Sequence, residues 1–207
     1  MKIKIILLIV IIFLAGCDNP AKDSFLNSLK GEVVYAKRDG LILNIYKINA
    51  NGRNKQLLYR HTGENNLNCS NPRWSKDGSK VSFSAMKNGK WSLFLMDPDG
   101  SNVEVVQAGE SLPLHLNSRQ ADIIVRYGSV YYLDEKGNEI EVYKFRDYNS
   151  KFNPGASEAS WSPDKQFIIF NSFKGSFLSS GRSNILIVGK DGKMARITEG
   201  IQADWKY

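Results

Sequence analysis

The sequence is poor in the side chains that most often bind metals or serve as nucleophile and base. Its 207 residues include two cysteines, Cys17 and Cys69, and two histidines, His61 and His115. No group of Cys and His has the spacing of a metal site, so we predict no metal and no cofactor. No Gly-x-Ser-x-Gly motif is present either, and we therefore expect no catalytic residues and no enzymatic activity.

Long apolar runs and dense basic runs are also missing. The longest apolar stretch, Ile5–Ala15, is shorter than the roughly 20 residues that a membrane-spanning helix needs. The formal net charge is +7, but the basic residues are spread along the chain and do not alternate with aromatic side chains in a compact run. We therefore expect no binding to nucleic acid.

The first 17 residues have the order of a bacterial export signal. Met1–Lys4 carry two lysines, Ile5–Ala15 are apolar, and the small residue Gly16 precedes Cys17. The segment Leu14–Cys17 resembles the lipobox of bacterial lipoproteins, in which diacylglycerol is attached to the cysteine before cleavage in front of it. This resemblance implies lipidation at Cys17. The alternative is an ordinary signal with a cysteine after small residues.

These motifs divide the chain into three parts. They are a signal peptide over 1–16, a lipidated cysteine with a flexible tether over 17–25, and a body over 26–207. Two acyl chains on one cysteine suffice for stable attachment, so membrane lipid is an expected partner. The protein is expected to face the periplasm or the exterior. The residue after the cysteine, Asp18, resembles an inner-membrane retention signal, but the choice between cell membrane and outer membrane stays open.

The body contains a repeat whose starting positions are 42 to 48 residues apart. Trp74 begins one copy and is followed by Val81 and Phe83, and Trp161 begins another and is followed by Ile168 and Phe170. The same template fits more weakly at Leu26 and at Leu116, where Ile123-Ile124-Val125 follows, and a fifth copy starts at Trp205. A period of about 40 to 50 residues is typical of four-stranded propeller blades.

Each unit also has a short apolar strand that runs into a turn closed by glycine. The turns are Asn49–Gly52, Asp97–Gly100, Asp134–Gly137 and Gly189–Gly192. Asp or Asn followed by Gly is typical of hairpins, because glycine adopts the positive φ that the turn requires. The sequence therefore predicts an all-β body of about four four-stranded units, with no helix after the signal.

The Trp-Ser-x-Asp start and the Asp-x-x-Gly hairpin resemble the propeller repeats of the TolB family. The resemblance spans about residues 26–205 and is strongest in the second and fourth units. It implies a six-bladed propeller, of which only four units are visible here. Three arrangements stay open: a truncated or degenerate six-bladed propeller, a small closed ring of four blades, and pairing with another chain.

Three sets of residues are candidates for packing or binding. Trp74, Trp161 and Trp205 recur at one position of the repeat, which favours packing between blades over ligand stacking. Aspartates in the turns could bind calcium, but their repeated position favours a role in the turn: Asp97, Asp99, Asp134 and Asp191. The longest insertion lies inside the fourth unit and is a possible binding loop, with Lys174, Ser176, Phe177 and Arg182.

Three hypotheses for function follow. The first is a non-enzymatic, membrane-anchored scaffold that binds another envelope protein or a peptide. The second is a sensor or enzyme accessory domain that binds a small ligand such as a glycan. The third is a truncated propeller fragment without a stable function.

Overall fold

Antiparallel hairpins build almost all of the structure, a computed structural model that describes residues 20–40, 42–62, 69–108, 122–145, 156–174 and 182–206. The described strands form three four-stranded sheets and one three-stranded sheet. The prediction of an all-β, propeller-like fold is confirmed. The third sheet has three strands in the described part, and residues 109–121, where its inner strand is expected, lie outside it.

We number the sheets in the order of the sequence units. Sheet I contains β15 (Ile201–Lys206), β1 (Glu32–Asp39), β2 (Ile42–Asn49) and β3 (Gln56–Tyr59). Sheet II contains β4 (Ser70–Trp74), β5 (Val81–Lys87), β6 (Lys90–Met96) and β7 (Glu104–Ala108). Sheet III contains β8 (Ile123–Arg126), β9 (Ser129–Leu133) and β10 (Glu139–Tyr143). Sheet IV contains β11 (Ala156–Trp161), β12 (Phe167–Lys174), β13 (Arg182–Gly189) and β14 (Met194–Glu199).

The segment around Trp205 does not begin a fifth unit, and this corrects the sequence interpretation. It forms β15, which pairs antiparallel with β1 and supplies the inner strand of sheet I. The first unit therefore takes its inner strand from the other end of the chain. Leu26, assigned as the start of that unit, lies in a helix instead.

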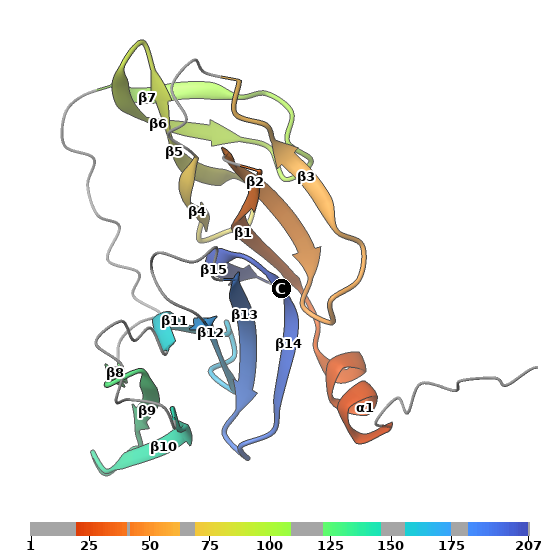
Figure 1. The fold of residues 1–207 in the computed structure, drawn as a ribbon, viewed down its shortest axis with the longest axis vertical. Helices are drawn as coiled ribbons and strands as arrows, with labels where there is room; N and C mark the ends of the chain where they lie inside the picture. Colours follow the sequence, from red (N-terminus) through yellow and green to blue (C-terminus); the bar gives the residue numbers. More distant parts are fainter. Residues whose placement is uncertain are drawn as a thin grey trace, which may run out of the picture.

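The four sheets follow one another around an open arc in the order III, IV, I, II (Figure 1). Three buried apolar cores fill the three junctions. One core joins III to IV, one joins IV to I and one joins I to II. Sheets II and III lie at opposite ends of the molecule (Figure 1), so the described strands form a partial propeller and not a closed ring of four.

A short helix, α1 (Pro20–Ser28), precedes the first strand. Proline is well suited to the first turn of a helix, where its missing N–H is not needed. Phe25 and Leu29 turn one face of this segment into the core between sheets IV and I, where they are 9% and 3% exposed. The prediction of a flexible tether is therefore wrong for residues 20–25, and the prediction of no helix is also wrong. Residues 17–19 lie outside the described part.

Cys17 and the whole signal segment also lie outside the described residues. Among the helices of the described part, none has the length and apolar character that a membrane crossing requires.

Candidate functional site

The inner strands of sheets II, IV and I share an unusual backbone position three residues before the tryptophan. Asn71, Glu158 and Gln202 occupy this position, and all three have left-handed φ values of 51°, 51° and 57°. Non-glycine residues adopt this conformation rarely. At each of these positions the inner strand has a bulge in its pairing with the next strand. The bulges bring the three positions together, and the Gln202 side chain contacts the other two.

Hydrogen bonds join these positions across three sheets. The Asn71 backbone N–H donates to Gln202 Oε1 over 2.9 Å, and Gln202 Nε2 lies 3.5 Å from Glu158 Oε1. Asn171 of β12 completes the group, because its Oδ1 accepts from the Gln202 backbone N–H over 3.0 Å and its Nδ2 donates to Glu158 over 2.9 Å. We call Asn71, Glu158, Asn171 and Gln202 the axial cluster.

The axial cluster carries one negative charge, on Glu158, and faces solvent. Asn71 and Glu158 are exposed, whereas Asn171 is buried beneath them. Arg73 lies beside the cluster and donates through Nη1 to the Gln202 carbonyl oxygen over 3.1 Å. Amides, one carboxylate and one guanidinium can form hydrogen bonds to the backbone and polar groups of a ligand. Glu158 is the one carboxylate of the cluster, and its two oxygens lie against Asn171 and Gln202, so the arrangement presents hydrogen-bonding groups to a ligand.

Two buried polar residues support the cluster from below. Asp204 of β15 is 2% exposed and accepts a hydrogen bond over 2.8 Å from the Trp74 backbone N–H, which ties sheet I to sheet II. Ser160 of β11 stands at the equivalent position, and its buried hydroxyl has no hydrogen-bond partner. Buried hydroxyl groups are usually paired. The Ser160 hydroxyl is an exception, and it can still donate and accept a hydrogen bond at the base of the inner strands.

The structure places the three repeated tryptophans in the junction cores. Trp74 lies in the core between I and II, Trp161 in the core between III and IV, and Trp205 in the core between IV and I. They are 6%, 3% and 1% exposed. None of the three presents an open ring face to a ligand, because each ring is packed between two sheets.

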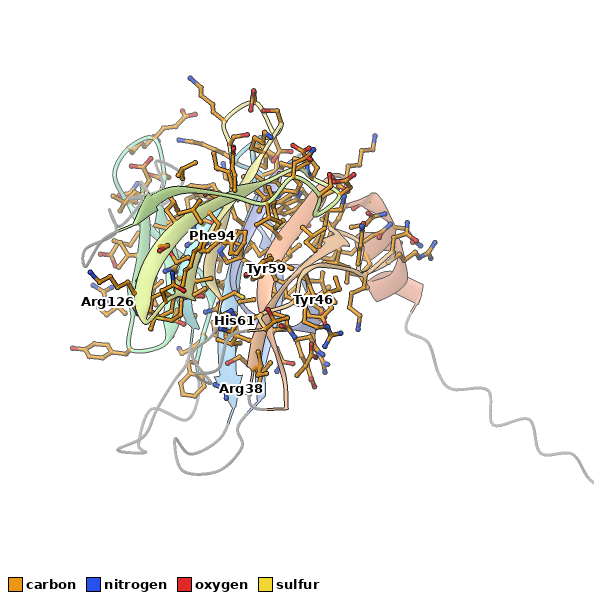
Figure 2. All side chains as sticks on the ribbon, turned by 90° about the horizontal axis from the view of Figure 1, so that it is seen from above. Arg38, Tyr46, Tyr59, His61, Phe94 and Arg126 are labelled. Atoms are coloured by element: carbon orange, nitrogen blue, oxygen red, sulfur yellow. The ribbon has the colours of Figure 1, made fainter. Side chains whose placement is uncertain are left out.

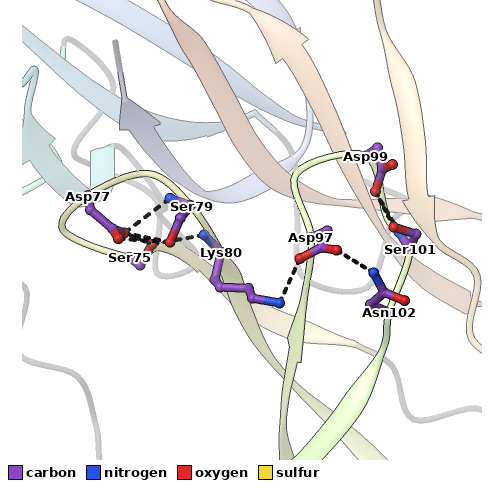
Figure 3. Close-up of polar contacts among 8 residues, drawn as sticks. All are labelled: Ser75, Asp77, Ser79, Lys80, Asp97, Asp99, Ser101 and Asn102. Carbon is purple, nitrogen blue, oxygen red and sulfur yellow. Dashed lines mark hydrogen bonds and ion pairs between the residues drawn. The ribbon is translucent and has the colours of Figure 1, made fainter.

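The turn aspartates act as local hydrogen-bond acceptors (Figure 3). Asp77 accepts from the Ser75 hydroxyl over 2.6 Å and from Ser79, and these bonds lower its pKa to about 2. Asp97 accepts from Lys80 Nζ over 2.6 Å, which lowers the pKa of this carboxyl group. Hydrogen bonds from their own turns also lower the pKa values of the remaining turn aspartates, Asp99, Asp134 and Asp191. Within the described residues, no group of three His, Cys, Asp or Glu side chains could hold a metal ion.

His61 and Cys69 lie near β2 of sheet I and not in the axial cluster. The His61 backbone N–H donates to Asn44 Oδ1 over 3.0 Å, while both imidazole nitrogens are buried without a partner. The Cys69 thiol is fully buried, and burial raises its pKa to about 12. Figure 2 shows His61 below Tyr59, whose ring packs against the aromatic core of sheet II. The second histidine, His115, lies outside the described residues.

The candidate binding loop of the fourth unit is only partly described. Lys174 and Arg182 are paired residues at the end of the β12–β13 hairpin from which the loop leaves. Ser176 and Phe177 lie outside the described residues.

A separate hollow of about 480 Å³ lies between α1 and the turns of sheet IV. Ser28, Phe167 and Lys190 are among the residues that line it. It is located on the α1 side of the molecule and shares no lining residue with the axial cluster.

Sequence reasoning missed the axial cluster. Its signal is present in the repeat, because a polar residue stands three positions before Trp74, Trp161 and Trp205 alike. The bulge at these positions arises from the pairing of each inner strand with its neighbour. The sequence does not reveal the bulge directly.

No family model matches this chain, and no curated protein does either. Among solved structures, TolB from Acinetobacter baumannii is similar with a TM-score of 0.47 and 12% identity, over 84% of this chain and 66% of that chain. A putative TolB from Agrobacterium tumefaciens gives 0.34 and 14%, over 83% of this chain and 48% of that chain.

The β-propeller domain of the Trilobed protease from Pyrococcus furiosus, described as having an open velcro topology, gives a TM-score of 0.30 and 18% identity. That match covers 83% of this chain and 55% of the other. This chain thus spans between 48% and 66% of these three proteins. The architecture given above follows from the strand pairing of this chain itself.

Proposed function

We propose that this protein is a non-enzymatic scaffold that binds a protein or peptide segment at the axial cluster and is held on a membrane by lipid at Cys17. The observation that carries the proposal is the meeting of three inner strands at left-handed polar residues, because it concentrates hydrogen-bonding groups at one exposed place.

The chemistry of the axial cluster supports binding to a polypeptide. Amide side chains such as Asn71 and Gln202 can donate and accept at once, which suits the alternating N–H and C=O groups of an extended backbone. Arg73 and Glu158 add one charge of each sign close by. Left-handed backbone at three equivalent positions costs about 1–3 kcal/mol each, and such strain is often found at ligand sites.

The experiment compares a photo-crosslinking amino acid placed at Glu158 with one placed at Met194 in the full chain in its native membrane. Both side chains are exposed, but Met194 lies on the outermost strand of sheet IV. We expect a discrete adduct from position 158 and none of that mass from position 194. No adduct from position 158, or the same adducts from both, would contradict the proposal.

The lipid anchor is tested separately. Cells grown with a labelled fatty acid should incorporate the label into the wild-type chain and not into the Cys17→Ser variant. The Cys69→Ser variant is the matched control and should keep the label. A wild-type chain that carries no lipid would refute the anchor while leaving the axial site to be judged by crosslinking.

A further inference from the structure

The two end sheets of the arc each keep one apolar face that nothing in the described structure covers. At the three existing junctions, each sheet uses the same strand positions for packing. The positions can be compared through the register of the second and third strands, because the pairs Ala36–Ile45, Ser84–Leu93, Val125–Val130 and Asn171–Ile185 are equivalent.

On sheet II, the uncovered face is built around Leu93. Its equivalents in the other sheets are Ile45, Ile185 and Val130, and each of these is fully buried in a junction core. Leu93 is only half-buried. Strand alternation places Met86, Trp91 and Leu95 on the same face, and all three are also half-buried.

On sheet III, the uncovered face is built around Ile124. Its equivalents are Tyr35, Phe83 and Phe170, which are fully buried at the three junctions. Ile124 is half-buried, as are its neighbours on that face, Tyr131 and Leu133. This register also corrects the sequence alignment of the third unit by one residue, since Ile124, and not Val125, matches Phe83.

At every junction in the arc, the face of one sheet that carries the equivalent of Leu93 packs on the face of the next sheet that carries the equivalent of Ile124. One chain has one face of each kind left over, and they lie at opposite ends of the molecule (Figure 1). We infer that a second copy of this chain covers both, so that sheet II of each copy packs on sheet III of the other. Two arcs of four sheets would then close a ring of eight, within the range of about four to eight blades that propellers use.

The geometry of such a ring is consistent with the other features of the chain. A head-to-tail contact that closes under rotation gives a finite ring and not a fibre. The two-fold axis would run along the axis of the propeller, so both α1 helices would lie on the same side of the ring. Both N-terminal segments could then reach one membrane, and each axial cluster would face the centre of the ring.

The charged residues of sheet III do not oppose this contact. Glu139 and Glu141 lie on the outermost strand, on the same face as Ile124. The equivalent part of sheet IV carries Arg196, which stays exposed although sheet IV packs against sheet III. The outer strand therefore tolerates charge at a packed junction.

The test is native mass spectrometry of the full chain in detergent, with the wild type, Leu93→Arg and Ile124→Asp. We expect two chains per particle for the wild type and one chain for each variant. Met194→Arg is the control, because it introduces an arginine, as Leu93→Arg does, at an exposed apolar residue on β14. This variant should still give two chains per particle. Circular dichroism melts verify that all variants remain folded.

Mixing the two variants gives the sharper result. In a mixed pair, one junction joins unchanged Leu93 to unchanged Ile124, and the other joins the new Arg to the new Asp. We expect the mixture to recover particles of two chains. A wild type that stays a single chain at micromolar concentration, a Leu93→Arg variant that still pairs, or a mixture that stays as single chains would each overturn the inference.

Discussion

At the scale of single residues, aspartate carboxylates accept hydrogen bonds that hold turns and neighbouring strands together. Asp77, Asp99 and Asp134 accept hydrogen bonds from groups two to four residues away, and their role could be predicted from the local sequence. Asp204 differs, because the backbone N–H that it accepts from belongs to Trp74, which is 130 residues away. No local pattern reveals such a partner, and this is why the base of the axial site was not predicted.

Replacing Asp204 with Ala should destabilise the fold. The change leaves the buried N–H of Trp74 without its acceptor, which costs about 1–3 kcal/mol. Urea unfolding followed by circular dichroism measures the loss. Asp99→Ala, at an exposed turn, is the control and should lose less than about 1 kcal/mol. Equal losses of unfolding free energy in the two variants would show that the Asp204 hydrogen bond contributes no more to stability than an exposed turn does.

The stability of the protein should also fall in acid through Asp39. Burial raises the pKa of this carboxyl group, but hydrogen bonds from Tyr46, Asn44 and Lys37 outweigh burial and lower the pKa from 3.8 to about 2. A pKa lowered by folding means that the ionised form stabilises the native state. That contribution is complete above the ordinary value of 3.8 and is lost as the pH falls through about 2.

The measurement is the melting temperature from pH 6 down to about pH 2, for the wild type and for Asp39→Asn. The wild type should melt at the higher temperature at pH 6, and the difference should shrink as the acid protonates Asp39. Two parallel curves would show that Asp39 does not contribute to the acid sensitivity.

At the scale of elements, β15 is the feature that the sequence did not predict. The hairpins could be predicted because turn and strand signals are adjacent in the chain. The inner strand of sheet I could not, since Trp205 Nε1 bonds to the Lys30 carbonyl oxygen across 175 residues. Helix α1 was missed for a related reason: its polar composition suggests a tether, and its helical state depends on burying Phe25 against sheets IV and I.

Gly31→Ala should loosen the contact between β15 and the start of β1. A Cβ at Gly31 would overlap the carbonyl oxygen of Lys206, and the backbone there has a φ of 90°. Gly137→Ala is the matched control, because its φ is 80° and a Cβ there meets nothing within 4 Å. Both variants pay about 1–2 kcal/mol for positive φ. Thermal unfolding should show a further loss of about 1–3 kcal/mol for Gly31→Ala alone; equal melting temperatures would contradict this.

At the scale of the whole molecule, the sequence predicted four repeats but not their arrangement. The angle between neighbouring sheets is set by how side chains interlock at each junction, and the repeat pattern contains no direct measure of it. Among the described residues, sheets I and IV each pack on both faces, whereas sheets II and III pack on one. In repeat architectures, stability is approximately a sum over units and neighbour contacts, so the ends of the arc should be its weakest parts.

Hydrogen exchange should show this gradient. In the Leu93→Arg variant, whose end faces are expected to stay uncovered, amides of β8–β10 should be at least about tenfold less protected than amides of β12 and β13. Mass spectrometry of peptic fragments gives the comparison within one molecule. Uniform protection across the four sheets would mean that the arc unfolds as a single unit.

The pairing of β15 with β1 also sets the timing of folding. Strand β1 is synthesised long before its partner, since the paired residues Val33 and Trp205 are 172 positions apart, and closing so long a loop carries an entropic cost that slows folding. Sheet I, at the middle of the arc, therefore cannot gain its fourth strand until β15 has been synthesised. The centre of the molecule is thus completed only when segments from the two ends of the described chain have come together.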